Sequence, residues 1–231
     1  MIVIESKIQS LEGLRMRYPN AIIADVTSEA KDALARLSPS FPHGEIPIPN
    51  SGWATAYSVE AIWQGLKVFE NEDINKSIFA RKNTVELKRN TSGLGKMIGH
   101  RYGMNGLEIL KFADAQNKIF IPCYRWVLDY KVLNIIERLR KANETKTIVL
   151  LDYNTNCDLQ NYKEPISCAY LVKAYAEGLP PYEDVFETKV INHYYCGRRI
   201  ISWTTEERRV KAIQTYEMPH QLELPFDYKD N

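Results

Sequence analysis

The segment 147–153, TIVLLDY, constrains the fold most strongly, because its continuous apolar character is typical of a strand buried on both faces. Two shorter runs rich in β-branched residues, 1–5 and 21–27, predict further strands near the start of the chain. Ser28 is predicted to cap a helix that ends near Leu37. The chain is therefore expected to open as strand, strand and helix.

Further elements follow from proline, glycine and apolar spacing. Segment 38–52 contains four prolines and two glycines, which predicts a loop. Helices are predicted over 59–69 and from Ser167 to Gly178, and two strands are predicted to turn near Gly197. A helix within 128–143 is predicted from apolar residues that share one face, namely Leu128, Val132, Ile135, Ile136 and Leu139. We expect one α+β domain over 1–231, with a mixed sheet, several amphipathic helices and a frayed tail at 223–231.

Composition excludes several classes of function. Lys and Arg number 30 against 29 Asp and Glu, so the net charge of +1 creates no global field toward nucleic acid or a membrane. The four cysteines form no C-x-x-C pair, which argues against a zinc ribbon or a disulfide framework. No segment has the pattern of a signal peptide or a membrane span. These observations predict a cytoplasmic protein without a bound metal or cofactor.

The segment 51–69, SGWATAYSVEAIWQGLKVF, places polar residues beside an apolar stripe of Val59, Ile62, Trp63 and Leu66. Glu60, Gln64 and Lys67 have the i, i+4, i+7 spacing and are predicted to align on one helix face. With Ser58 as the N-cap, Glu60 falls in the first turn, where the helix dipole favours an ionised carboxylate. Spacing alone favours a Glu that only complements the dipole, while Gln64 and Lys67 face water.

The residues of this segment resemble a known signature. LSPSFP (37–42), followed by GWATAYSVEAIWQGLKVF (52–69), resembles the opening of the NADAR (YbiA-like) family. That family has a Trp, a Ser/Thr-Val-Glu triplet, and a Gln and a Lys-Phe along the following helix. The matching positions are Trp53, Ser58, Val59, Glu60, Gln64 and Lys67. The chain departs from the pattern at Ala61, where many members have His, and it lacks a downstream Asp-x-x-Trp-Gly segment.

The resemblance implies an N-glycosidase-like hydrolase. Members of the family cleave phosphorylated ribosylamines, or ADP-ribose attached to guanine, so the implied substrate is a ribosyl or ADP-ribosyl compound, free or in modified nucleic acid. Breaking that bond develops oxocarbenium character, and Glu60 is the carboxylate that would stabilise it or align a water. Lys67 would hold a phosphate or Glu60 itself, and Gln64 a ribose hydroxyl. Trp53 or Trp63 would stack on the base, although the apolar stripe favours a core position for Trp63.

A second carboxylate candidate lies in the loop after the buried strand. DYNTNCD, 152–158, follows segment 147–153 at its carboxyl end, where ligand-binding loops often lie. Asp158 is therefore the second catalytic candidate. The same alternation is at least as typical of a turn built on Asx hydrogen bonds. A calcium loop is disfavoured, because the required Gly and closing Glu are out of register.

Two basic segments support an alternative function. TSGLGKMIGHRYG, 91–103, fails the P-loop pattern because Asn90 and Met97 stand at required positions. With Lys88, Arg89, Lys96, His100 and Arg101, this region is either a basic patch for phosphates or an ordinary solvated loop. HYYCGRR, 193–199, mixes aromatics with arginines, a composition that suits base stacking. The alternative is a non-catalytic nucleotide- or nucleic-acid-binding module. The predicted substrate-binding residues are Trp53, Ser58, Gln64, Lys67 and Arg101.

Overall fold

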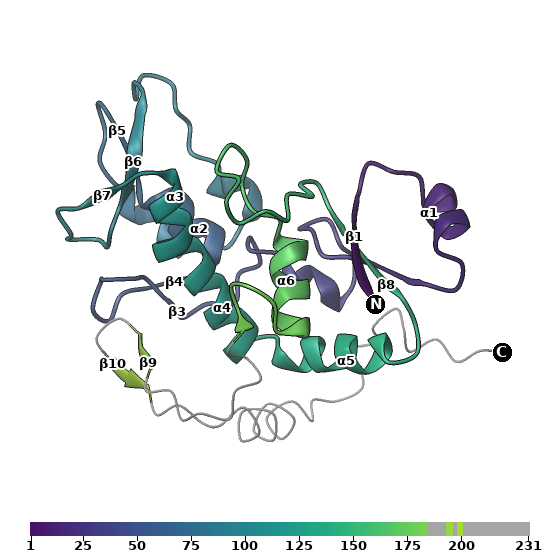
Figure 1. Cartoon of the computed structure of the whole chain (residues 1–231). Helices are drawn as coiled ribbons and strands as arrows, with labels where there is room; N and C mark the ends of the chain where they lie inside the picture. Colours follow the sequence, from purple (N-terminus) through teal and green to yellow (C-terminus); the bar gives the residue numbers. More distant parts are fainter. Residues whose placement is uncertain (184–192, 196–197, 201–231) are drawn as a thin grey trace. The chain divides into compact units, whose positions relative to one another are not determined.

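The computed structural model describes residues 1–183, 193–195 and 198–200 (Figure 1). Helices and several sheets are both present, which confirms the predicted α+β class. The described chain divides into two compact units, and it passes between them after Ser38 and after Val127. No helix in the described ranges is long and apolar enough to cross a membrane. The predicted tail at 223–231 lies outside the described residues.

The first unit comprises 1–38 and 128–183 and is built on a parallel sheet of three strands. Its strands are β1 (Ile2–Ser6), β2 (Ile22–Asp25) and β8 (Ile148–Asp152), in the order β1-β8-β2. Ile148 in the central strand pairs with Ile2 on one side and with Ile22 on the other. The first three residues of β8 are fully buried, so the prediction of a buried strand here, and of strands at both upstream runs, is confirmed.

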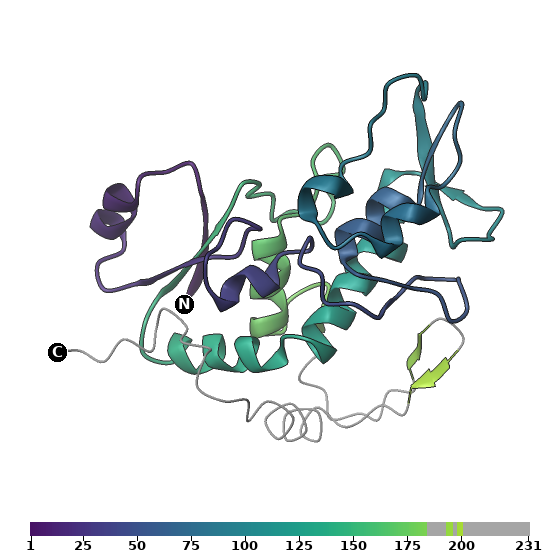
Figure 2. The same ribbon diagram turned by 180° about the vertical axis from the view of Figure 1, so that it is seen from behind.

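Two helices of the first unit cover this sheet. Helix α6 (Cys168–Glu177) contacts β1 and β8, and α5 (Leu133–Asn143) contacts α6 and β8 (Figure 2). Ser167 caps α6 through a bond from Tyr170 N, and Gly178 ends it in the left-handed conformation with φ of 66°. The predicted start and end of this helix are confirmed.

The predicted opening of strand, strand and helix is wrong in two respects. A short helix, α1 (Leu11–Arg17), lies between β1 and β2, capped by Ser10. Ser28 caps no helix; the next element is a 3-10 helix, η1 (Ala33–Leu37), whose cap is Asp32. The Asp32 carboxylate accepts from Leu34 N at 2.8 Å, a bond that a short side chain makes readily at a helix start.

The helix predicted within 128–143 is two helices. Helix α4 (Ile121–Tyr130) ends before Val132, whose φ of −136° is not helical, and α5 then begins at Leu133. Ile135 N and Ile136 N both bond to Val132 O, which starts the new helix. The five apolar residues that led to the prediction are nevertheless all buried.

The second unit comprises 39–127 with the described residues 193–195 and 198–200, and its sheets are antiparallel. Strands β5 (Lys67–Phe69), β6 (Met97–Arg101) and β7 (Ile109–Leu110) form one sheet in that order, and β3 (Ile46–Pro47) pairs with β4 (Thr55–Ala56). The hairpin predicted near Gly197 is present as β9 (His193–Tyr195) and β10 (Arg198–Ile200). Parallel and antiparallel pairing thus occur in separate sheets.

The helices of the second unit are short. They are α2 (Val59–Gly65), the 3-10 helices η2 (Lys76–Ala80) and η3 (Thr84–Leu87), and α3 (Phe112–Ala115), which continues through the π-helical segment η4 (Gln116–Phe120) into α4. Helix α2 contacts η2 and η4, and α3 contacts β6 and β7. Helix α2 therefore lies next to the continuous helical stretch of α3 and η4, which itself packs on the β5-β6-β7 sheet.

The helix predicted over 59–69 ends four residues early. Gly65 lies against Phe79, whose ring carbon would be 2.2 Å from a Cβ at this position, and the Gly65 carbonyl accepts from Asn75 N at 2.8 Å. The chain therefore leaves the helix, and Lys67–Phe69 become β5, with Val68 and Phe69 buried. Lys67 is a strand residue rather than a helix residue.

Candidate functional site

The start of α2 is fixed by hydrogen bonds around Glu60. Ser58 is fully buried, and its hydroxyl oxygen accepts from Ala61 N at 3.0 Å, which confirms the predicted N-cap. Glu60 N donates to Pro39 O at 2.9 Å. These bonds place the Glu60 carboxylate in the first turn of the helix, where unpaired N–H groups favour negative charge. A contact between Ser58 and a substrate stays a prediction.

Glu60, Gln64 and Lys67 form a hydrogen-bonded series that we call the Glu60 row. Gln64 Nε2 donates to Glu60 Oε1 at 2.6 Å, and Lys67 Nζ donates to Gln64 Oε1 at 2.8 Å. All three side chains are half-buried. The row forms even though Lys67 lies in β5, because only one residue separates the end of the helix from the start of the strand. Gln64 and Lys67 therefore bond within the row instead of simply facing water.

Lys67 is a cation in an unfavourable environment. Burial lowers the pKa of Lys67; the Glu60 carboxylate partly opposes this effect, and the charge of Arg89 adds to it. The Arg89 side chain is only 4% exposed, and its Nη1 donates to Lys67 O at 2.7 Å. Two cations are thus held close together at one end of the row. Glu72 already pairs with Arg89 at 3.0 Å, so an anion bound there would mainly compensate the charge of Lys67.

His100 and Trp63 lie beside the Glu60 row. His100 in β6 pairs with Lys67 in β5, so both side chains leave the same face of the sheet. The rings of Trp63 and His100 are 3.8 Å apart between centroids, and Phe112 and Phe120 meet Trp63 edge-on. Trp63 is half-buried, so it lies at the edge of the core.

His100 is fully buried, and both its nitrogens lack a hydrogen-bond partner among the described residues. Burial, with a smaller effect of Lys67, lowers the pKa of His100 to about 3. The imidazole is therefore uncharged at neutral pH and does not contribute to the basic patch expected from the sequence. Each buried polar group left without a partner costs about 1–3 kcal/mol. The sequence placed His100 only among the basic residues of segment 88–101; its burial follows from the pairing of β6 with β5 and β7.

The remaining predicted binding residues differ in their surroundings. Trp53 lies between β3 and β4 and is 70% exposed, as a stacking residue must be. Arg101 donates from Nε and Nη2 to the two carboxylate oxygens of Asp73, both at 2.9 Å, and from Nη1 to Gly106 O at 2.8 Å. These bonds hold Arg101 in place within the protein, and a substrate contact by Arg101 stays a prediction.

Asp158 belongs to the first unit, whereas Glu60 belongs to the second. Asp158 is exposed, and its Oδ1 accepts from Gln160 N at 2.8 Å. Asn154, Asn156 and Asn161 accept the backbone N–H two residues onward in the same way. The loop is thus a series of Asx turns, the alternative expected from its alternation. A catalytic role for Asp158 stays a prediction.

The described residues bear on a metal site and on the basic patch of segment 88–101. No group of three His, Cys, Asp or Glu side chains in them could hold a metal ion. Within segment 88–101, Arg89 and Arg101 are tied to protein partners, whereas Lys88 and Lys96 are exposed. The side chains of the 193–199 segment lie outside what the structure describes.

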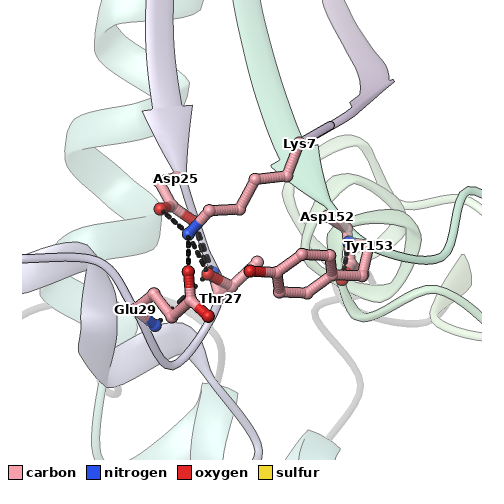
Figure 3. A network of polar contacts seen from close by, with 6 residues as sticks. All are labelled: Lys7, Asp25, Thr27, Glu29, Asp152 and Tyr153. Carbon is pink, nitrogen blue, oxygen red and sulfur yellow. Dashed lines mark hydrogen bonds and ion pairs between the residues drawn. The ribbon is translucent and has the colours of Figure 1, made fainter. Parts of the chain in front are cut away.

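The structure also brings together a polar cluster that sequence reasoning missed, at the carboxyl end of the parallel sheet (Figure 3). We call it the Lys7 cluster: Lys7, Asp25, Thr27, Glu29, Asp152 and Tyr153. Lys7 Nζ contacts Asp25 Oδ2 at 2.6 Å, Thr27 Oγ1 at 2.9 Å and Glu29 Oε2 at 3.1 Å, and lies 5.4 Å from the Tyr153 ring centre. Carboxyl ends of parallel strands commonly form ligand sites. The sequence signal that could have predicted this cluster is a charged residue at, or just after, the end of each of the strands β1, β2 and β8.

The Lys7 cluster makes stability depend on pH. Burial acts to raise the pKa of Asp25, but hydrogen bonds from Lys7 and Thr27 outweigh it and hold that pKa below its ordinary value of 3.8. A carboxyl whose folded pKa is lowered stabilises the fold above its unfolded pKa, and this contribution is lost as pH falls through the folded pKa. Asp25→Asn should therefore cost about 1 kcal/mol at pH 7, after allowance for solvent screening, and less at pH 3.

Urea titrations at pH 7 and pH 3 measure this difference. Asp158→Asn is the matched control, because Asp158 is an exposed carboxylate without a cationic partner among its described hydrogen bonds. An Asp25→Asn cost that is the same at both pH values would contradict the linkage.

Comparison with known proteins gives a family but no activity. A family model described as a family of unknown function (DUF6939) matches residues 6–172, which is more than two thirds of the 231 residues. No curated protein and no solved structure matches the chain. The matched range includes strands β2 and β8 of the parallel sheet, the Glu60 row and His100. The chain belongs to DUF6939, a family whose function is unknown.

Proposed function

We propose that the protein is an N-glycosidase-like hydrolase that cleaves a ribosyl or ADP-ribosyl N-glycosidic bond at Glu60. The observation that carries the proposal is the Glu60 row, in which Gln64 holds one carboxylate oxygen at 2.6 Å and links it to the buried ammonium of Lys67. The resemblance of segments 37–42 and 52–69 to the NADAR signature supports the same residues. A cytoplasmic location is part of this proposal.

The row supplies the groups that the reaction needs. As the bond from the anomeric carbon to the base nitrogen breaks, its electron pair goes to the base and positive charge develops on the sugar. The Glu60 carboxylate stabilises that charge and accepts a proton from the attacking water, whose oxygen bonds to the anomeric carbon. The leaving base takes one proton from solvent water, and Glu60 then releases its proton to solvent. Gln64 fixes the orientation of Glu60, so the carboxylate is positioned before the substrate binds.

The two cations at the other end of the row favour an anionic substrate. Arg89 is compensated by Glu72 at 3.0 Å, whereas no carboxylate of the described residues forms an ion pair with the neighbouring Lys67, so the uncompensated charge is that of Lys67. A phosphate or pyrophosphate on the ribose would supply the missing negative charge. This arrangement favours a phosphorylated ribosyl or ADP-ribosyl compound over a neutral nucleoside.

Lys67→Met is expected to weaken binding of a phosphorylated substrate. Loss of one charge-assisted hydrogen bond, worth about 1.5–3 kcal/mol, corresponds to an increase in KM of roughly 10- to 150-fold. Lys118→Met is the control, because Lys118 is exposed and pairs with Glu108 at 3.3 Å. Steady-state kinetics at constant ionic strength measure both variants. Equal KM values for Lys67→Met and wild type would refute the phosphate contact.

The direct test of the function is mass spectrometry on a panel of ribosyl compounds incubated with the protein. The panel comprises ADP-ribosylated guanosine, ADP-ribosylated DNA and ribosylaminopyrimidine phosphates. Release of a free base with one water added to the sugar is the expected product. If the full panel remains intact after prolonged incubation, the proposed function is wrong, and the alternative of a nucleotide- or nucleic-acid-binding module gains weight.

That alternative makes a different prediction. Binding to nucleic acid through Lys and Arg contacts weakens steeply as salt rises, because counterions are released. Affinity for single-stranded DNA or RNA should then fall in the double variant Arg198→Ala, Arg199→Ala. Glu60→Gln should leave this affinity unchanged. Two arginines of the other basic segment, Arg89 and Arg101, already bond to protein groups, so the glycosidase has the better support.

A further inference from the structure

His100 is the feature that the proposed reaction leaves unexplained. Its side chain is fully buried, and neither Nδ1 nor Nε2 has a hydrogen-bond partner among the described residues. An uncharged imidazole carries one N–H donor and one acceptor, so burial leaves both unsatisfied. Buried polar groups in proteins are almost always paired, and exceptions concentrate where a ligand or a catalytic role supplies the partner.

The position of His100 identifies the site that it serves. His100 is opposite Lys67 in the β5–β6 pairing, and the centre of its ring lies 3.8 Å from that of Trp63, with the rings tilted by 33°; Trp63 lies one turn after Glu60 in α2. Lys67 is in turn bonded through Gln64 to Glu60. His100 is thus next to the Lys67 end of the row, on the face of the sheet that carries Lys67, and it contacts the helix of Glu60 through Trp63.

We propose that His100 belongs to the same site as the Glu60 row and donates a hydrogen bond to the nitrogen base that leaves the sugar. This inference rests on the proposed function. When the bond to the sugar breaks, its electron pair stays on the base, and an N–H donor aimed at the base lowers the cost of that charge. His100 neither gains nor loses a proton in this role. The proton that the base acquires balances the one that water gives to Glu60.

The environment of His100 suits this role. The neighbouring Lys67 and burial disfavour an imidazolium, so the ring remains an uncharged donor across the physiological pH range. An uncharged imidazole acts as an electrophilic hydrogen-bond donor without a protonation step. Trp63 contacts the His100 ring, and Phe112 and Phe120 meet Trp63 edge-on, so His100 lies beside an aromatic group against which a planar base packs favourably.

His100→Phe and His100→Gln test the proposal. Phe keeps an aromatic ring against Trp63 but has no donor, so kcat on the cleaved compound should fall about 10²- to 10³-fold, as for loss of one transition-state donor. The melting temperature should not fall, because the variant removes an unsatisfied polar group from the interior. Gln retains an uncharged N–H donor, so kcat of His100→Gln should be at least about tenfold higher than kcat of His100→Phe. His43→Phe is the control, since His43 contacts the Phe41 ring at 4.7 Å in the same unit.

The outcomes separate this inference from the proposed function. Wild-type turnover that is lost in Glu60→Gln but unchanged in His100→Phe refutes the role of His100 and leaves the glycosidase intact. Equal loss of stability and activity in both His100 variants also refutes it, because that pattern indicates a structural role. If wild type cleaves nothing, equilibrium dialysis with guanosine decides: weaker binding by His100→Phe upholds base recognition, and equal or absent binding overturns it.

Discussion

Replacement of Glu60 by Gln is expected to slow base release about 10³-fold while the protein remains folded. Gln has the same size and retains an oxygen that can accept from Gln64 Nε2, so the row keeps its geometry. It loses the negative charge that would stabilise the developing cation and accept a proton from water. The effect should appear in kcat, because the lost interaction is made in the transition state.

Stability should change little in this variant. Removing a charge from the first turn costs about 0.3–1 kcal/mol of interaction with the helix dipole. Glu12→Gln is the matched control, because Glu12 also lies in the first turn of a helix capped by Ser, in α1 of the other unit. Its thermal unfolding should shift similarly while base release stays at the wild-type rate. Full turnover by Glu60→Gln would remove Glu60 from the reaction.

Gly103→Ala is expected to destabilise the second unit by about 2–4 kcal/mol. Gly103 has φ of 91°, and a Cβ there would lie 2.2 Å from the Asn50 carbonyl oxygen. Two loops meet at this point: Asn50 Nδ2 donates to Tyr102 O at 3.0 Å, and Met104 N donates to Ser51 Oγ at 2.8 Å. The clash therefore involves backbone that cannot move without breaking these bonds.

Gly93→Ala separates the clash from the backbone strain. Gly93 has a similar φ of 76°, but nothing lies within 4 Å of a Cβ placed on it. Only the left-handed conformation is penalised there, at roughly 1 kcal/mol. Urea unfolding of both variants gives the difference. If Gly103→Ala loses no more stability than Gly93→Ala, the close approach of the two loops is not a constraint in solution.

The sequence predicts the elements of this fold where a local signal decides them. Segment 147–153 is a strand because its short, β-branched apolar run favours one, and Ser167 and Gly178 delimit α6 because cap chemistry is local. The end of α2 was missed because it depends on Phe79, which packs against Gly65 from another element. The break at Val132 likewise has no Gly or Pro to mark it.

The candidate site was predictable to the extent that it lies along one helix. Glu60 and Gln64 are one turn apart, so their alignment follows from helical spacing. His100 joins them only through the register of β5 with β6, and register depends on turns and packing that spacing does not encode. The Lys7 cluster was missed for the same reason, since it needs β8 between two strands from the start of the chain.

The order β1-β8-β2 has a consequence for synthesis on the ribosome. β1 and β2 are translated first but are not neighbours, and the strand between them begins at Ile148, 123 residues after Asp25. At about 5–20 residues per second this delay is on the order of 10 s. Residues 39–127 are complete before then, so α2 and the β5-β6-β7 sheet can form first. For that interval the nascent chain carries two unpaired strands that a chaperone, or another nascent chain, can bind.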